Sequence, residues 1–171
     1  GGLRSIEDIK AVLRVGADKV CLYTAAINNP QLIKDASRKF GSSTIVVAIE
    51  AIKESNGKYL AYTDNGREYT GIDVFEWAQK VAELGAGEIL LTSMNNDGTK
   101  AGFALDITAE LSEAVNVPII ASGGAGSKQD FEILFNRTKA TGGLAASIFH
   151  YNEIPIPELK NYLKTKNIPI R

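Results

Sequence analysis

The stretch Pro118-Ile119-Ile120-Ala121-Ser122-Gly123-Gly124 decides the fold class, because an unbroken apolar segment here runs into a pair of glycines. Three further apolar segments, at residues 44–50, 88–93 and 143–147, end in small, hydroxyl or acidic residues ahead of a helix-like pattern. Strands without polar alternation are buried on both faces, which is typical of a parallel sheet covered by helices. We therefore predict an α/β protein with its functional groups at the carboxyl ends of the strands.

A regular alternation of strands and helices extends along the chain. The predicted strands are 19–24, 44–50, 88–93, 118–122 and 143–148, and the predicted helices are 5–14, 30–40, 73–84, 105–115 and 128–136, with a last helix from residue 152 or 155. Right-handed crossovers between parallel strands then require either a doubly wound sheet or a barrel.

Residues 51–70 interrupt this alternation. Asn56-Gly57 and Asn65-Gly66 are turn signals typical of hairpins, and a strand-like run at 58–62 lies between them. We expect an antiparallel hairpin inserted after a sheet strand. It either covers an active site or forms a passive surface hairpin.

An internal repeat favours the barrel. Gly1-Gly2-Leu3-Arg4-Ser5-Ile6-Glu7-Asp8 aligns with Gly123-Gly124-Ala125-Gly126-Ser127-Lys128-Gln129-Asp130, and with one inserted residue Thr24 falls on Ser147. This period spans four βα units, which is half of an eight-fold barrel. Because a complete barrel needs roughly 250 residues, we expect residues 1–171 to form a single, incomplete (β/α)8 TIM-barrel domain. Its five parallel strands would match strands 4–8, the C-terminal two-thirds of the barrel.

Composition limits the possible partners. The chain has 171 residues, a formal net charge of −1 and interspersed charges, which argues against nucleic acid or a membrane as the main partner. Its single cysteine, Cys21, excludes an internal disulfide and is expected to be a core thiol rather than a nucleophile. The sequence shows neither a signal peptide nor an apolar stretch of transmembrane length, so we expect a cytoplasmic protein.

The glycine-rich turn at 123–126 offers backbone N–H groups beside a helix N-terminus. Glycine lets an anion approach the main chain, and the helix dipole favours negative charge. Ala146 and Ser147 follow the neighbouring strand, and adjacent loops after the last two strands of a barrel commonly form one phosphate site. The alternative is a tight turn without a ligand. By the repeat, Gly2 and Thr24 form a second site across the barrel mouth, which predicts a substrate with two phosphates.

Two acids, Glu50 and Asp97, lie at or just beyond strand ends between these two sites. Two carboxylates facing one cleft suit proton transfer without a metal, whereas the alternative is a pair of solvated salt bridges. No histidine or cysteine cluster is present to hold zinc, so no metal or cofactor is predicted. The only histidine, His150, is expected to be structural rather than catalytic. Trp77 is expected to pack between helix and sheet.

Four motifs are specific in combination. They are Gly85-Ala86-Gly87-Glu88-Ile89-Leu90-Leu91-Thr92-Ser93, Asn96-Asp97-Gly98-Thr99, Pro118-Ile119-Ile120-Ala121-Ser122-Gly123-Gly124-Ala125-Gly126 and Ala145-Ala146-Ser147-Ile148-Phe149-His150. With them, the chain resembles the family of cyclase subunits of imidazole glycerol phosphate synthase over essentially all 171 residues. The resemblance implies a (β/α)8-barrel lyase of histidine biosynthesis that receives ammonia from a separate glutaminase subunit. The substrate would be a bis-phosphorylated formimino-aminoimidazole carboxamide ribonucleotide, and the products imidazole glycerol phosphate and aminoimidazole carboxamide ribonucleotide.

The resemblance also implies roles for individual residues. Glu50 would be the general base, and Asp97 a second acid or a group that orients the substrate. One phosphate would be bound by Ser122, Gly123, Gly124, Ala146 and Ser147, the other by Gly2 and Thr24, and the rest of the substrate by Thr92, Asp97 and Gly98. Lys19 and Glu88 would belong to a charged gate that faces the glutaminase.

The chain departs from the family pattern at several positions. The family has aspartate where Glu50 stands, and commonly has asparagine where Tyr23 stands and aspartate where Ala104 stands. Its general acid lies on a first strand that would precede Gly1, so we expect the chain alone to lack a complete catalytic pair. Two alternatives stay open. One is a paralogous ammonia-delivering synthase subunit for surface-sugar amidation, and the other is an inactive, phosphate-binding partial barrel with two open sheet edges.

Overall fold

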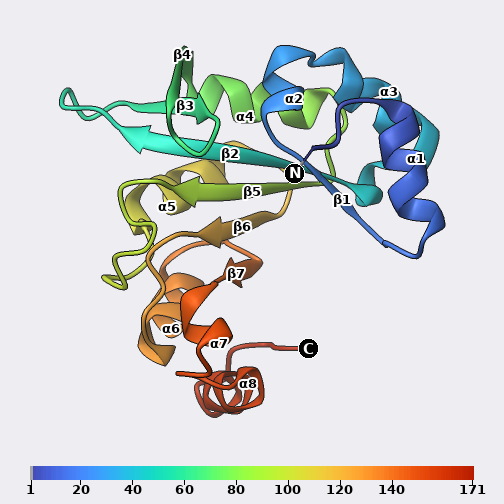
Figure 1. Cartoon of the computed structure of the whole chain (residues 1–171). Coiled ribbons are helices and arrows are strands. Elements are labelled where there is room, and N and C mark those ends of the chain that lie inside the picture. Colours follow the sequence, from blue (N-terminus) through green and yellow to red (C-terminus); the bar gives the residue numbers. More distant parts are fainter. Residues whose placement is uncertain (1) are drawn as a thin grey trace.

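The computed structural model describes residues 2–171. Its strands form one sheet in the order β4-β3-β2-β5-β6-β7, with β1 beside β2 (Figure 1). The strands are β1 (Val20–Leu22), β2 (Ile45–Lys53), β3 (Tyr59–Thr63), β4 (Glu68–Asp73), β5 (Glu88–Ser93), β6 (Ile119–Ser122) and β7 (Gly142–Leu144). Strands β1, β2, β5, β6 and β7 pair in parallel. The predicted α/β fold is confirmed, and the described strands form an open sheet, as in an incomplete barrel.

Strand β2 organises the sheet. Strand β5 occupies one edge of β2 between Val46 and Ala51. The other edge is shared, because β1 pairs in parallel with Ile45 and its neighbours, whereas β3 pairs antiparallel from Glu50 to Lys53. Strand β4 pairs with β3, so the predicted antiparallel hairpin is present and extends the sheet beyond the carboxyl end of β1.

The helices lie close to where the sequence predicts them. They are α1 (Ile6–Arg14), α2 (Thr24–Asn28), α3 (Gln31–Phe40), α4 (Val74–Glu83), α5 (Leu105–Ala114), α6 (Lys128–Arg137), α7 (Ser147–His150) and α8 (Ile156–Thr165), with a 3₁₀ turn at Ser42–Thr44. None of the helices between residues 2 and 171 is long and apolar enough to cross a membrane.

The two short helices were not predicted, and they correct two strand boundaries. The strand expected at 143–148 ends at Leu144, and Ser147 begins α7. Helix α7 puts Ile148, which is fully buried, into a cluster with Phe131 of α6 and Leu159 of α8. The strand expected at 19–24 likewise ends at Leu22, because Thr24 begins α2. Burial against neighbouring helices outweighs the local preference for a strand in α7.

The two faces of the sheet differ in character. The outer face is a continuous core in which Ile45, Val47 and Ile49 of β2 are fully buried with residues of α1, α3, α4 and α5. Trp77 belongs to this core, as predicted. The inner face carries a smaller apolar band in which Val46, Ala48 and Leu90 are buried and Cys21, Tyr23 and Ile120 pack against them.

Candidate functional site

Polar side chains line up across the carboxyl end of the inner face. In register, Glu50 pairs with Thr92, Thr92 pairs with Ser122, and Ser122 pairs with Leu144. Register partners in parallel strands point to the same face, and neighbouring strands lie about 4.8 Å apart. Three predicted site residues therefore stand side by side above the apolar band, within about 10 Å.

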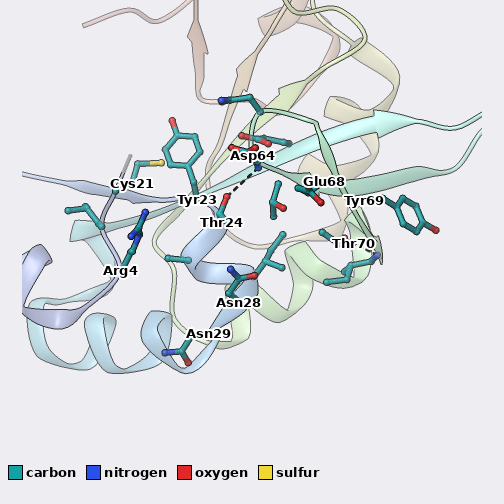
Figure 2. A pocket seen from close by; sticks show the side chains of 18 residues that line it. Arg4, Cys21, Tyr23, Thr24, Asn28, Asn29, Asp64, Glu68, Tyr69 and Thr70 are labelled. Atoms are coloured by element: carbon teal, nitrogen blue, oxygen red, sulfur yellow. Dashed lines mark hydrogen bonds between the residues drawn. The ribbon is translucent and has the colours of Figure 1, made fainter.

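A cavity of about 1190 Å³ lies beside this row. Its lining includes Gly2, Arg4, Thr24, Asn28, Glu50 and Asp64. Figure 2 shows it from close by, with Thr24 on one side and the β3–β4 hairpin on the other. The structure thus brings three predicted residues, Gly2, Thr24 and Glu50, into one cavity, and the hairpin forms part of its wall.

The hydrogen bonds of Glu50 and Thr24 both come from the loop of this hairpin. The Gly66 N–H donates to Glu50 Oε2 at 2.9 Å, and the Asp64 N–H donates to Thr24 Oγ1 at 3.4 Å (Figure 2). Burial raises the pKa of the Tyr23 hydroxyl, and the nearby Cys21 and Glu50 raise it further. A half-buried carboxylate therefore lies near a phenol that stays protonated at neutral pH.

Asp97 lies elsewhere. It is an exposed residue of the loop after β5, where its N–H donates to the Ser93 carbonyl oxygen at 3.0 Å. Asp97 lines neither the main cavity nor a second cavity of about 550 Å³ between Lys53 and Asp106. Gly98 is exposed in the same loop. A cleft shared by Glu50 and Asp97 stays a prediction.

The glycine run after β6 has a packing role. A Cβ atom on Gly124 would lie 2.0 Å from the Gly102 carbonyl oxygen, and one on Gly123 would lie 2.6 Å from the Ser93 carbonyl oxygen. The N–H groups of Gly126 and Ser127 donate to Asp130 Oδ2 at 2.9 and 2.8 Å. Close approach of the loop after β5 thus accounts for these glycines, and phosphate binding there stays a prediction.

Ser147 and Thr24 occupy equivalent places in the repeat. Each is the first residue of a short helix that follows a strand, with Ala146 and Tyr23 as the respective N-caps. Gly2 and Gly124 both have positive φ, at 89° and 96°. Gly1, the other glycine of the aligned pair, lies outside the described residues. The order α1-β1-α2-α3 therefore recurs as α6-β7-α7-α8.

Comparisons with known proteins agree with this arrangement. A family model described as "Histidine biosynthesis protein" matches residues 1–155. The whole chain is 50% identical to the imidazole glycerol phosphate synthase subunit HisF of Alkaliphilus metalliredigens and 54% identical to that of Lachnoclostridium phytofermentans, covering 68% and 67% of those proteins. The HisF subunit of Hydrogenobaculum sp. is 52% identical over 171 residues, of which the chain covers 68%. The chain belongs to the histidine biosynthesis family. Its matches to HisF support the cyclase-subunit function in that pathway.

Two residues expected at the gate of this family meet at the opposite end of the inner face. Lys19 Nζ contacts Glu88 Oε1. Lys19 precedes β1 and Glu88 begins β5, so the pair lies at the amino ends of the strands. The apolar band with Val46 and Leu90 separates this ion pair from Glu50.

Two other reactive side chains were expected to be structural. Cys21 is half-buried, packs against the apolar band and lines the main cavity. Burial raises the pKa of the Cys21 thiol to about 11, so the thiol stays protonated at neutral pH and is a poor nucleophile. His150 is an exposed residue at the end of α7 and lines neither cavity. Among residues 2–171, no group of three or more histidine, cysteine, aspartate or glutamate side chains is placed to hold a metal ion.

Several cavity residues were not identified from the sequence. Arg4 and Asn28 line the cavity, and so do Asp64 and Asn65 of the hairpin. Two signals were available. Arg4 replaces the Gly126 of the other repeat half, and the Asn65-Gly66 turn signal marks the part of the hairpin that reaches Glu50.

Proposed function

We propose that the chain binds a bis-phosphorylated formimino-aminoimidazole carboxamide ribonucleotide and uses ammonia from a glutaminase partner to form imidazole glycerol phosphate and aminoimidazole carboxamide ribonucleotide. The observation that carries this proposal is the cavity in which Gly2, Thr24 and Glu50 meet at the carboxyl ends of parallel strands. Ligands of barrel enzymes bind at this face, and the HisF matches supply the reaction class.

Glu50 acts as the general base in this proposal. Its Oε2 atom accepts the Gly66 N–H, and its Oε1 atom makes no hydrogen bond with any described residue. A carboxylate that is held by one oxygen keeps the other for a substrate proton. Thr92 and Ser122 stand in the same row and contact the substrate between Glu50 and the glycine turn after β6. Asp97, which lies in the exposed loop after β5 and outside the main cavity, is the second acid or orienting group in this proposal.

The two phosphates bind at the two ends of the repeat. One lies at Gly2 and Thr24, where Arg4 lines the same cavity and supplies positive charge. The other lies at Gly123, Gly124 and Ser147. Because the two halves share a backbone arrangement, a substrate with a phosphate at each end spans the mouth of the sheet.

Ammonia enters from the other end of the strands. Lys19 and Glu88 form an ion pair at the amino ends, and the glutaminase docks there. The buried members of the apolar band between this pair and Glu50 are Val46, Ala48 and Leu90, whose side chains form no hydrogen bonds and so would not retain ammonia. Cys21 and Tyr23 pack against this band. A surface-sugar synthase, the alternative that Glu50, Tyr23 and Ala104 would fit, has less support, because the relatives matched over the whole chain are HisF subunits.

The test is turnover of the bis-phosphorylated ribonucleotide with ammonium salts by the intact protein and by Glu50→Gln. We expect Glu50→Gln to lower kcat by roughly 10²-fold or more, as loss of a general base does. Glu110→Gln, an exposed position on α5, is the matched control and should keep full turnover. Unchanged turnover in Glu50→Gln would remove Glu50 from the mechanism, and a folded wild-type protein without turnover would contradict the proposed reaction.

A further inference from the structure

The loop at the tip of the β3–β4 hairpin, residues 64–67, contacts two side chains of the proposed site at once. Its Gly66 N–H donates to Glu50 Oε2, and its Asp64 N–H donates to Thr24 Oγ1. Glu50 lies on β2, one residue before its pairing with β5 ends, and Thr24 begins α2, so these two residues come from separate elements. The tip loop is the described segment that links them by hydrogen bonds.

We propose that the tip loop is a positioning element, in which the Gly66 amide sets the orientation of the Glu50 carboxylate. This inference rests on the proposed role of Glu50 as general base. A donor on Oε2 leaves Oε1 directed at the substrate proton. Because Thr24 Oγ1 accepts the Asp64 N–H, the Thr24 hydroxyl proton stays available for a phosphate oxygen.

The conformation of the tip loop is unusual and is held by its own contacts. Asp64, Asn65 and Gly66 all have positive φ, at 54°, 59° and 76°. Non-glycine residues adopt this region at an energetic cost, and such residues persist where the surroundings enforce them. Arg67 does so here, because its Nε donates to the Asp64 carbonyl oxygen at 2.9 Å and its Nη2 contacts Asp64 Oδ1 at 3.1 Å.

Side chains from β2 and from the loop after β5 fix the tip loop against the sheet. A Cβ atom on Gly66 would lie 3.1 Å from Met94 Cε and 3.6 Å from Ile52 Cδ1, so the glycine sits directly on these side chains. At the base of the hairpin, the Tyr59 hydroxyl lies 2.9 Å from Asp106 Oδ2, and Lys53 Nζ lies 2.7 Å from the same oxygen. The amide that meets Glu50 is therefore placed by packing at both ends of the hairpin.

Because residue 50 is a glutamate, its longer side chain makes the contact with Gly66 important for placing the carboxylate. Glutamate has one methylene more than aspartate, which adds a rotatable bond and moves the carboxylate by an ångström or more. Misplacement on that scale costs on the order of 10²-fold in rate. The Gly66 amide removes this freedom by holding Oε2. An aspartate at position 50 would bring the carboxylate closer to β2 and away from the tip loop.

A measurement without turnover tests the contact itself. In the ¹⁵N-labelled intact protein, the Gly66 amide proton should change its chemical shift as the Glu50 carboxyl group titrates, and Glu50→Gln should abolish this change. Gly57, at the other hairpin turn, is the matched control, because it also has positive φ and a Cβ atom there would meet nothing within 4 Å. Identical pH behaviour of the Gly66 and Gly57 amides would overturn the proposal, whether or not the enzyme is active.

Kinetics then test the positioning role. Gly66→Ala should lower kcat by about tenfold or more, with KM within about twofold, because substrate binding is kept while the base is displaced. Gly57→Ala should leave both parameters unchanged. In a Glu50→Asp background, Gly66→Ala should add less than about twofold to the loss, since the contact is already absent. Equal effects of Gly66→Ala in both backgrounds would show that the tip loop acts only through stability.

Discussion

Ser5 and Ser127 have the same backbone conformation at equivalent places in the two halves of the repeat. Their φ and ψ angles are −143° and 165° for Ser5, and −141° and 165° for Ser127. Each closes a capping box with the aspartate three residues later, Asp8 or Asp130. The amide before each serine also donates to that aspartate, at 2.9 Å in both halves. The internal repeat is therefore present in the structure as well as in the sequence.

The capping box of α1 predicts a pH dependence of stability. Hydrogen bonds from the Arg4 amide and from Ser5 lower the pKa of Asp8 below its ordinary value of 3.8. A carboxyl group with a depressed pKa in the folded state stabilises the fold above its unfolded pKa, and this contribution is lost as pH falls through the folded pKa. We expect Asp8→Asn to lower the free energy of unfolding above about pH 4, with the two proteins converging at lower pH.

Chemical denaturation at a series of pH values measures this difference. Asp18→Asn is the control, because Asp18 is exposed and its side chain forms no hydrogen bond with any described residue. A difference between wild type and Asp8→Asn that is the same at every pH would contradict the prediction.

The hydrogen bond between Tyr59 and Asp106 at the base of the β3–β4 hairpin predicts a local change in dynamics when it is removed. Tyr59→Phe removes the hydroxyl that lies 2.9 Å from Asp106 Oδ2, and a lost hydrogen bond of this kind costs about 1 kcal/mol. Relative to wild type, we expect Tyr59→Phe to speed amide hydrogen exchange in β3 and β4 more than in β6. Mass spectrometry on peptides measures this exchange. Tyr151→Phe, at an exposed position, should exchange as wild type does. Uniformly faster exchange over the whole sheet would show global destabilisation instead.

The ion pair at the amino ends of the strands predicts that a Lys19 variant loses more turnover with glutamine than with ammonium salts as the nitrogen source. Lys19→Ala breaks the contact with Glu88, which lies far along the strands from Glu50. We expect glutamine-dependent turnover with the proposed glutaminase partner to fall severalfold more than turnover with ammonium salts, because free ammonia does not depend on delivery through the gate. Lys160→Ala, at an exposed position on α8, should change neither rate. Equal losses with both nitrogen sources would argue against a gate at Lys19.

Local patterns were sufficient for most of the fold. The apolar runs at β2, β5 and β6 and the Asn56-Gly57 turn each act over a few residues, so periodicity and turn signals reveal them. The sequence also predicted that polar groups gather toward the carboxyl ends of parallel strands, where Glu50, Thr92 and Ser122 lie, but not that these three residues are in register.

Contacts between distant segments were decided only by tertiary structure. Helix α7 replaces the end of a predicted strand because Ile148 is buried by α6 and α8, which no local window contains. The Gly66 amide reaches Glu50 only because the hairpin folds back along β2 and rests on Met94 and Asp106. A hydrogen bond across 16 positions, from a backbone amide to a carboxylate, depends on the direction of one side chain and on the conformation of a turn, and sequence periodicity specifies neither. The sequence by itself thus determined which polar residues are available, whereas tertiary packing decided their positions relative to one another.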